Sequence, residues 1–126
     1  METEKRKFDL EDRLVDFACL CLEVCDLLPQ SKAGQNLEYQ LSKSGTAAAL
    51  IYGEAQSAES PADFLHKVKQ TLKEIRESRV NLKIITRKPI VVHKKAGEAI
   101  AESNELIAIF LKSIETAKKN SEKLKK

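Results

Sequence analysis

Apolar residues recur alternately four and three positions apart along four stretches of this chain, and that spacing constrains the fold more than any other feature. It is the spacing of one face of an α-helix, and over several turns it matches helices that pack side by side with left-handed coiling. Proline and serine separate the stretches: Pro29 follows the first, Ser60-Pro61 opens the third, and Pro89 ends it. The predicted helices cover residues 8–28, 32–56, 61–87 and 92–119, with a polar tail, 120–126, that we expect to fray.

Short connections between long helices leave one simple arrangement. The links hold only a few residues, so each helix must turn back on the one before it. The chain has 126 residues, enough for one hydrophobic core but not for two ordinary domains. We therefore predict an all-α fold with a single domain, residues 1–126, built as an antiparallel up-down-up-down four-helix bundle with left-handed packing.

The first helix carries more apolar surface than one bundle interior requires. Its main stripe is formed by Leu10, Leu14, Phe17, Cys21, Val24 and Leu28. A second stripe lies beside the first and is formed by Val15, Ala18, Leu22 and Cys25. We interpret the second stripe as an oligomer interface, so that the first expected partner is another copy of this chain.

Three cysteines stand close together at Cys19, Cys21 and Cys25. A zinc site needs a fourth ligand, and the two histidines, His66 and His93, lie far along the chain. Small apolar side chains in a reduced compartment explain the same cysteines, so we expect free thiols and no metal.

Other motifs of chemistry are missing from the sequence. No nucleophile has a base near it, and no glycine-rich phosphate loop occurs. The amino terminus is charged and no apolar signal segment follows it, while every apolar run is too short to cross a membrane. We expect a cytoplasmic protein with no enzymatic activity, no cofactor and no membrane contact.

The net charge of +3 is unevenly distributed along the chain. Residues 1–30 carry four basic and eight acidic side chains, whereas residues 61–96 carry ten basic and three acidic ones. Such a basic helix attracts the phosphates of RNA or DNA, without aromatic residues to stack on bases. Pairing with the acidic first helix, across the bundle or an oligomer interface, is the alternative. The candidate nucleic-acid-binding residues are Lys69, Lys73, Arg76, Lys83, Arg87, Lys88, Lys94 and Lys95.

One polar pair between helices is also predicted. Glu54 lies one residue from the apolar stripe of the second helix, and the third helix carries Arg76 and Arg79. A buried or half-buried ion pair between Glu54 and one of these arginines would set the register of the two helices.

Several segments resemble a known family. Residues 40–46 (QLSKSGT), 52–56 (YGEAQ), 60–67, 72–78 and 109–118 are similar to the bacterial four-helix-bundle family named for ribosomal RNA intervening sequences. The similarity spans roughly residues 10–119. Two positions depart from the family pattern: Ile51 stands where asparagine is expected, and Gly53 where arginine is common.

The resemblance implies an up-down bundle that assembles as a ring-like homopentamer and has no established enzymatic activity. More distantly, the chain resembles the accessory proteins of diversity-generating retroelements, which are basic pentamers that bind nucleic acid and a reverse transcriptase. Two functional hypotheses follow. The protein is either an oligomeric accessory factor that binds RNA or DNA through its third helix, or a structural or protein-interaction module without a nucleic-acid role.

Overall fold

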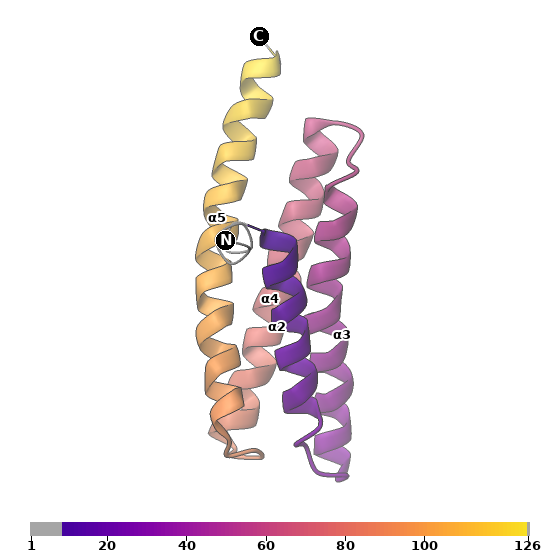
Figure 1. Cartoon of the computed structure of the whole chain (residues 1–126), viewed down its shortest axis with the longest axis vertical. Coiled ribbons are helices and arrows are strands. Elements are labelled where there is room, and N and C mark those ends of the chain that lie inside the picture. The colour runs from indigo at the N-terminus through magenta and orange to yellow at the C-terminus, as the bar shows by residue number, and fades with distance from the viewer. Residues whose placement is uncertain (1–8, 126) are drawn as a thin grey trace, which may run out of the picture.

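The computed structural model describes residues 9–125, and four α-helices make up almost all of them. Each helix runs antiparallel to the one before it, so the chain passes down, up, down and up along one long axis (Figure 1). The predicted all-α four-helix bundle is confirmed. The helices are α2 (Leu10–Cys25), α3 (Lys32–Ala55), α4 (Pro61–Arg87) and α5 (Lys94–Lys125).

Short polar side chains cap the start of each helix. The side chains of Asp9, Ser31 and Ser60 accept hydrogen bonds from backbone amides three residues later. At the start of α5, the ring Nδ1 of His93 accepts a hydrogen bond of 3.1 Å from the backbone amide of Lys95. These bonds satisfy amides that the first helical turn leaves unpaired, which explains why the helices begin where they do.

Three predicted boundaries were wrong by two or more residues, and the predicted first residue of helix one, residue 8, lies outside the described residues. α5 begins at Lys94, two residues after the expected start. α2 ends at Cys25, three residues before the expected Leu28, because the amides of Leu27 and Leu28 turn back to the carbonyls of Val24 and Cys25. This tight turn keeps Leu28 buried outside the helix. At the other end, α5 continues to Lys125, past the expected limit at residue 119. Residues 120–125 include two lysines, one leucine and one glutamate, which favour helix, and contain no glycine or proline.

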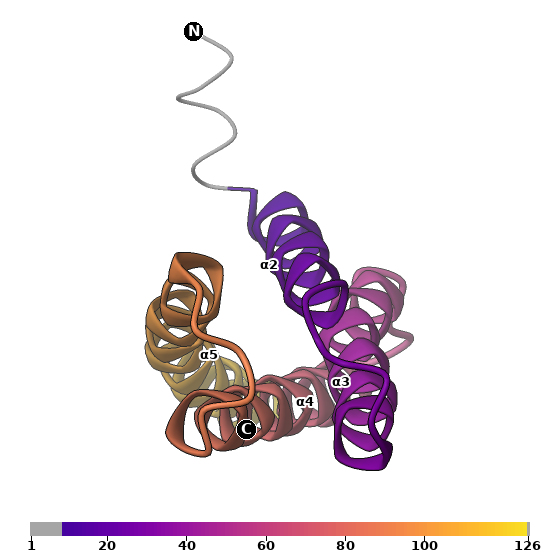
Figure 2. The same cartoon turned by 90° about the horizontal axis from the view of Figure 1, so that it is seen from below.

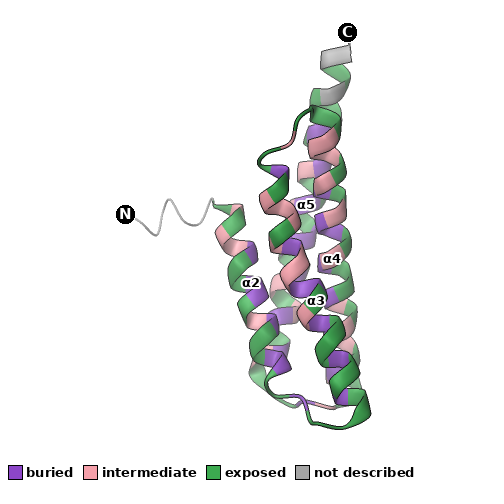
Figure 3. Ribbon diagram, turned by 90° about the vertical axis from the view of Figure 1, so that its right-hand side faces the viewer, coloured by how far each residue is buried: buried purple, intermediate pink, exposed green. Residues whose placement is uncertain are grey.

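The core lies along the predicted stripes. Buried residues face the interior and exposed ones face outward along every helix (Figure 3). Phe17 and Phe110 are among the largest fully buried side chains, and the Phe110 ring meets the Tyr52 ring edge to face, with centroids 5.5 Å apart. Ser44 and Ser78 form a buried hydrogen bond of 2.8 Å between α3 and α4, so even the polar core positions are satisfied.

The four helices do not pack equally around the bundle. Extensive contacts join α2 to α3, α3 to α4 and α4 to α5, but α2 contacts α5 much less (Figure 2). α2 has 16 residues and α5 has 32. At Gly45 the backbone of α3 approaches α2 so closely that an added Cβ would lie 2.9 Å from the Cβ of Cys21. α2 is therefore held tightly on its α3 side and loosely on its α5 side.

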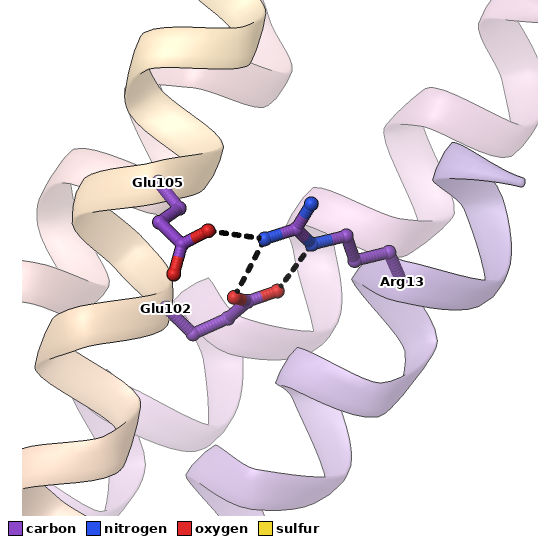
Figure 4. Close-up of polar contacts among 3 residues, drawn as sticks. All are labelled: Arg13, Glu102 and Glu105. Atoms are coloured by element: carbon purple, nitrogen blue, oxygen red, sulfur yellow. Dashed lines mark hydrogen bonds and ion pairs between the residues drawn. The ribbon is translucent and has the colours of Figure 1, made fainter. Parts of the chain in front are cut away.

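An ion-pair cluster centred on Arg13 joins α2 to α5 on this loosely packed side. Arg13 donates two hydrogen bonds to Glu102, of 2.7 and 3.0 Å, and a third to Glu105 at 3.0 Å (Figure 4). The hydrogen bond that Arg13 donates to Glu102 is the main cause that raises the pKa of Arg13. Arg13 and Glu102 are only partly exposed, so solvent screens this pair less than a pair on the open surface.

We expect a double-mutant cycle on Arg13→Ala and Glu102→Ala to show a coupling of about 1 kcal/mol in the free energy of unfolding, because the two-point geometry fixes both side chains. Urea unfolding of the four proteins measures it. The pair Lys119–Glu115 serves as control, since both of its side chains are exposed on one helix. Its coupling should be only about 0.3 kcal/mol; equal couplings in the two cycles would contradict a special role for Arg13.

No helix among residues 9–125 is both long enough and apolar enough to span a membrane.

Candidate nucleic-acid interface

A row of cations occupies the outer side of α4. Its members recur three, four or seven residues apart, on a side of the helix that lies roughly a third of a turn from the buried stripe of Val68, Ile75 and Leu82. All are exposed except Lys83, which is half-buried. The row extends over about 27 Å, at 1.5 Å per residue. We call it the α4 basic face, and it comprises Lys69, Lys73, Arg76, Lys83 and Arg87.

No member of the α4 basic face forms an ion pair with another described side chain. The ion pairs within residues 9–125 use other cations: Arg13, Lys67, Lys95 and Lys119. The acidic α2 contributes one carboxylate to a cation from the basic segment, Glu23 to Lys95. The described part of the bundle therefore leaves the α4 basic face without a direct ion pair.

The α4 basic face also contains apolar residues and a shallow hollow. Val80 is 53% exposed and Ile84 is 47% exposed, and both lie between the cations. A hollow of about 550 Å³ runs along the helix. Its lining is Lys69, Lys73, Arg76, Gln40, Leu72, Glu77, Val80 and Asn81. This surface can therefore make charge-based contacts along a chain of phosphates and apolar contacts at its centre.

The predicted cations in the turn after α4 divide into two groups. Lys88 caps the carboxyl end of α4 and is exposed, and Lys94 at the start of α5 is exposed as well. Lys95 instead binds Glu23 of α2 and helps to hold the bundle together. Lys88 and Lys94 can extend the α4 basic face around its end, whereas Lys95 already has a partner.

The predicted pair between Glu54 and an arginine of α4 is wrong. Glu54 accepts a 2.8 Å hydrogen bond from Lys67 and is largely exposed. Arg79 donates to Asn104 of α5 at 3.0 Å, and its buried Nε has no partner among the described atoms. Arg76 is exposed on the α4 basic face. Lys67 lies nine residues before Arg76 on α4, which places it opposite the end of α3.

The predicted oligomer stripe on α2 is only partly at the surface. Val15 is 44% exposed and Leu22 is 40% exposed, but Ala18 and Cys25 are buried within the subunit. A stripe that includes Ala18 and Cys25 therefore cannot be a surface, which corrects the prediction. The sequence pattern did not assign other exposed apolar side chains to a surface, because most of them stand next to apolar residues that turn inward and form no stripe of their own. They include Leu27, Tyr39, Leu50, Leu111 and Val92.

The three cysteines differ in their surroundings. Cys19 is exposed, whereas Cys21 and Cys25 are buried. Burial raises the pKa of Cys21 to about 12 and that of Cys25 to about 11, from an ordinary 9.0. All three are free thiols, and no cluster of three His, Cys, Asp or Glu side chains that could hold a metal occurs in the described part of the chain.

The buried thiols predict a loss of stability in alkali. A thiol with a higher pKa in the folded state keeps its proton while the unfolded thiol ionises, so unfolding becomes easier as the pH rises above about 9. Between the pKa of the unfolded thiol and that of the folded one, each buried thiol lowers the free energy of unfolding by about 1.4 kcal/mol per pH unit. Between pH 8 and 10, we expect the free energy of unfolding, measured with urea, to fall less in Cys21→Ala than in the parent protein. Cys19→Ala, at an exposed position, should follow the parent protein, and a Cys21→Ala slope equal to the parent's would contradict the mechanism.

Comparison with known proteins identifies the fold. A crystal structure of a protein of unknown function from the S23 ribosomal protein family, from Bacteroides thetaiotaomicron, superposes with a TM-score of 0.76. The two chains are 24% identical, and the match covers 82% of this chain and 96% of the other. No family model and no curated protein match the sequence. The similarity supports a shared four-helix architecture.

Proposed function

We propose that this protein is a non-enzymatic factor that binds the backbone of RNA or DNA through the α4 basic face. The observation that carries this proposal is a row of cations about 27 Å long in which no member has an ion-pair partner among the described residues. Cations that only solubilise a bundle have no reason to gather on one side of one helix. A polyanion that runs along α4 would contact all of them and release condensed counterions.

The absence of exposed aromatic residues from this face argues for backbone recognition. Stacking on bases needs rings, and the side chains between the cations are Val80 and Ile84. Contacts to phosphates position a protein without reading sequence. We therefore propose binding with weak sequence preference, and RNA is the first partner to test, since the structural neighbour is assigned to a ribosomal protein family.

We also propose that several copies act together. Val15 and Leu22 leave apolar surface on α2 that a second copy could cover. Repetition of the α4 basic face in a ring would multiply weak contacts with one polyanion. The resemblance at residues 40–46, 52–56 and 60–67 supports membership of the intervening-sequence family, and with it a pentamer. Light scattering that finds monomers at micromolar concentration would rule out this assembly.

Titration with RNA and with duplex DNA at two salt concentrations tests the function. If four or five phosphates are neutralised, the logarithm of the duplex association constant should fall with a slope of about −4 against the logarithm of salt concentration. Binding should weaken by about 10²-fold between 50 and 200 mM salt. No binding at low salt would leave the alternative, a module that recognises another protein.

A further inference from the structure

One aromatic ring among residues 9–125 lies largely in water. Tyr39 of α3 is 61% exposed. The other aromatic side chains of this range are buried in the core or pack against it: Phe17, Tyr52, Phe64 and Phe110. A ring stabilises a fold mainly through the area that it buries, so an exposed ring on α3 gives the bundle little. The ring of Tyr39 is therefore free to contact another molecule.

Tyr39 lies beside the α4 basic face. α3 and α4 run side by side in opposite directions, and the hydrogen bond between Ser44 and Ser78 fixes their register (Figure 1). Tyr39 precedes Ser44 by five residues, so it is level with the part of α4 about five residues after Ser78, between residues 80 and 84. Gln40, the next residue of α3, lines the hollow of the α4 basic face. The ring thus stands at the α3 border of that hollow.

A lysine of α3 contacts the ring and adds positive charge at this border. The Nζ atom of Lys43 lies 5.7 Å from the centroid of the Tyr39 ring, which is a cation–π distance. Burial raises the pKa of the Glu74 carboxyl on α4, and the charge of Lys43 opposes that rise, so Lys43 lies on the side of α3 that borders α4. Lys43 forms no ion pair within residues 9–125. A ring and a cation therefore extend the α4 basic face onto α3.

We propose that the α4 basic face binds a single strand of RNA, with an unpaired base stacked on Tyr39. This inference rests on the proposed function and adds the form of nucleic acid that the surface selects. The phosphates follow the cations along α4, and a base directed toward α3 reaches the ring, because neighbouring helices lie only roughly 8–10 Å apart. Stacking on an aromatic side chain tolerates every base, so the weak sequence preference is retained.

A duplex does not offer the same contact. Its bases are paired and stacked on one another, and turning one out toward Tyr39 would cost the energy of unpairing and unstacking. The cations of α4 can contact the phosphates of either form, whereas the ring can stack only with a base that is free. Affinity for a duplex should therefore depend on the α4 basic face alone, and affinity for a single strand should depend on Tyr39 as well.

Fluorescence anisotropy at low salt tests the proposal with two probes, a short RNA without self-complementarity and the duplex that it forms with its complement. Tyr39→Ala should weaken binding of the single strand about tenfold and leave duplex binding unchanged, because only the single strand loses a stacked base. Tyr39→Phe keeps the ring and should bind both probes as the parent protein does. Leu50→Ala removes another exposed apolar side chain of α3, one without a ring, and should also match the parent.

Circular dichroism of the four proteins should be the same, since Tyr39 and Leu50 are both largely exposed. Equal binding of the single strand by the parent and by Tyr39→Ala would overturn the proposal, and so would an equal loss of affinity for both probes. In either case, duplex binding that depends on the cations of α4 would leave the proposed function in place. A parent protein that binds neither probe would overturn both.

Discussion

Simultaneous replacement of Lys69, Lys73, Lys83 and Arg87 by glutamate is expected to abolish nucleic-acid binding. The variant replaces attraction to phosphates with repulsion along most of the α4 basic face, so the affinity for RNA at 50 mM salt should fall by more than about 10³-fold. The fold should survive, because three of the four side chains are exposed and glutamate favours helix nearly as well as lysine and arginine. Fluorescence anisotropy measures the binding, and circular dichroism measures the helix content.

A matched variant separates the α4 basic face from net charge. Lys32, Lys118, Lys119 and Lys123 are exposed on α3 and α5, and their replacement by glutamate changes the net charge by the same amount. The two variants are also compared at 0.15 M salt, where charges farther away than about 8 Å are screened, so this variant should retain most of its affinity. If both variants lose the same affinity, the interaction depends on overall charge and the proposed interface is wrong.

Replacing Phe110 by alanine is expected to cause the largest loss of stability from a single substitution. The ring is fully buried in the main core and packs edge to face on Tyr52. Removing it should lower the free energy of unfolding by about 3–5 kcal/mol, from lost burial and an unfilled cavity. The melting temperature should fall on the order of 10–20 °C. Urea unfolding and thermal melts both measure this loss.

The neighbouring residue provides the control. Leu111 is on the same helix and is 47% exposed. Leu111→Ala should therefore cost less than about 1 kcal/mol, because much of the side chain is already in water. Equal losses at the two positions would mean that Phe110 is not at the centre of the core.

Most of the fold could be predicted because helical periodicity is a local property. The stripes Leu14-Phe17-Cys21-Val24 and Val68-Leu72-Ile75 are buried as the spacing indicates. The end of α2 could not be predicted from Pro29, because the tight turn at Leu27 and Leu28 depends on Leu28 reaching the core. The prediction that the second stripe of α2 is exposed was wrong for a similar reason. Ala18 and Cys25 are covered by neighbouring helices. Which helix covers them depends on the packing angles between helices, and the sequence of one helix does not determine those angles.

In the candidate site, too, local features could be predicted from the sequence, whereas features that depend on packing between helices could not. The exposure of most of the α4 basic face follows from its position outside the buried stripe of α4, so the sequence could locate it. The partner of Glu54 depends on the axial register of α3 and α4, and Arg76 lies about 13 Å too far along α4. The sequence did contain a signal for the correct partner. Residues that face each other in an antiparallel helical hairpin lie at similar distances in sequence from the turn, and Glu54 and Lys67 lie at similar distances from Ser60.

The loose seam between α2 and α5 also bears on how the native bundle opens. Few contacts close that seam, and two sets of ion pairs bridge it, Arg13 with Glu102 and Glu105, and Glu23 with Lys95. Transient excursions of the native state should therefore release the amino-terminal helix first, while α3, α4 and α5 stay closed as one cooperative unit. The amides of α2 would then exchange with solvent at a lower free energy than those beside Ile75 or Phe110. Each excursion would briefly expose Cys21, a thiol that the closed bundle keeps from oxidants.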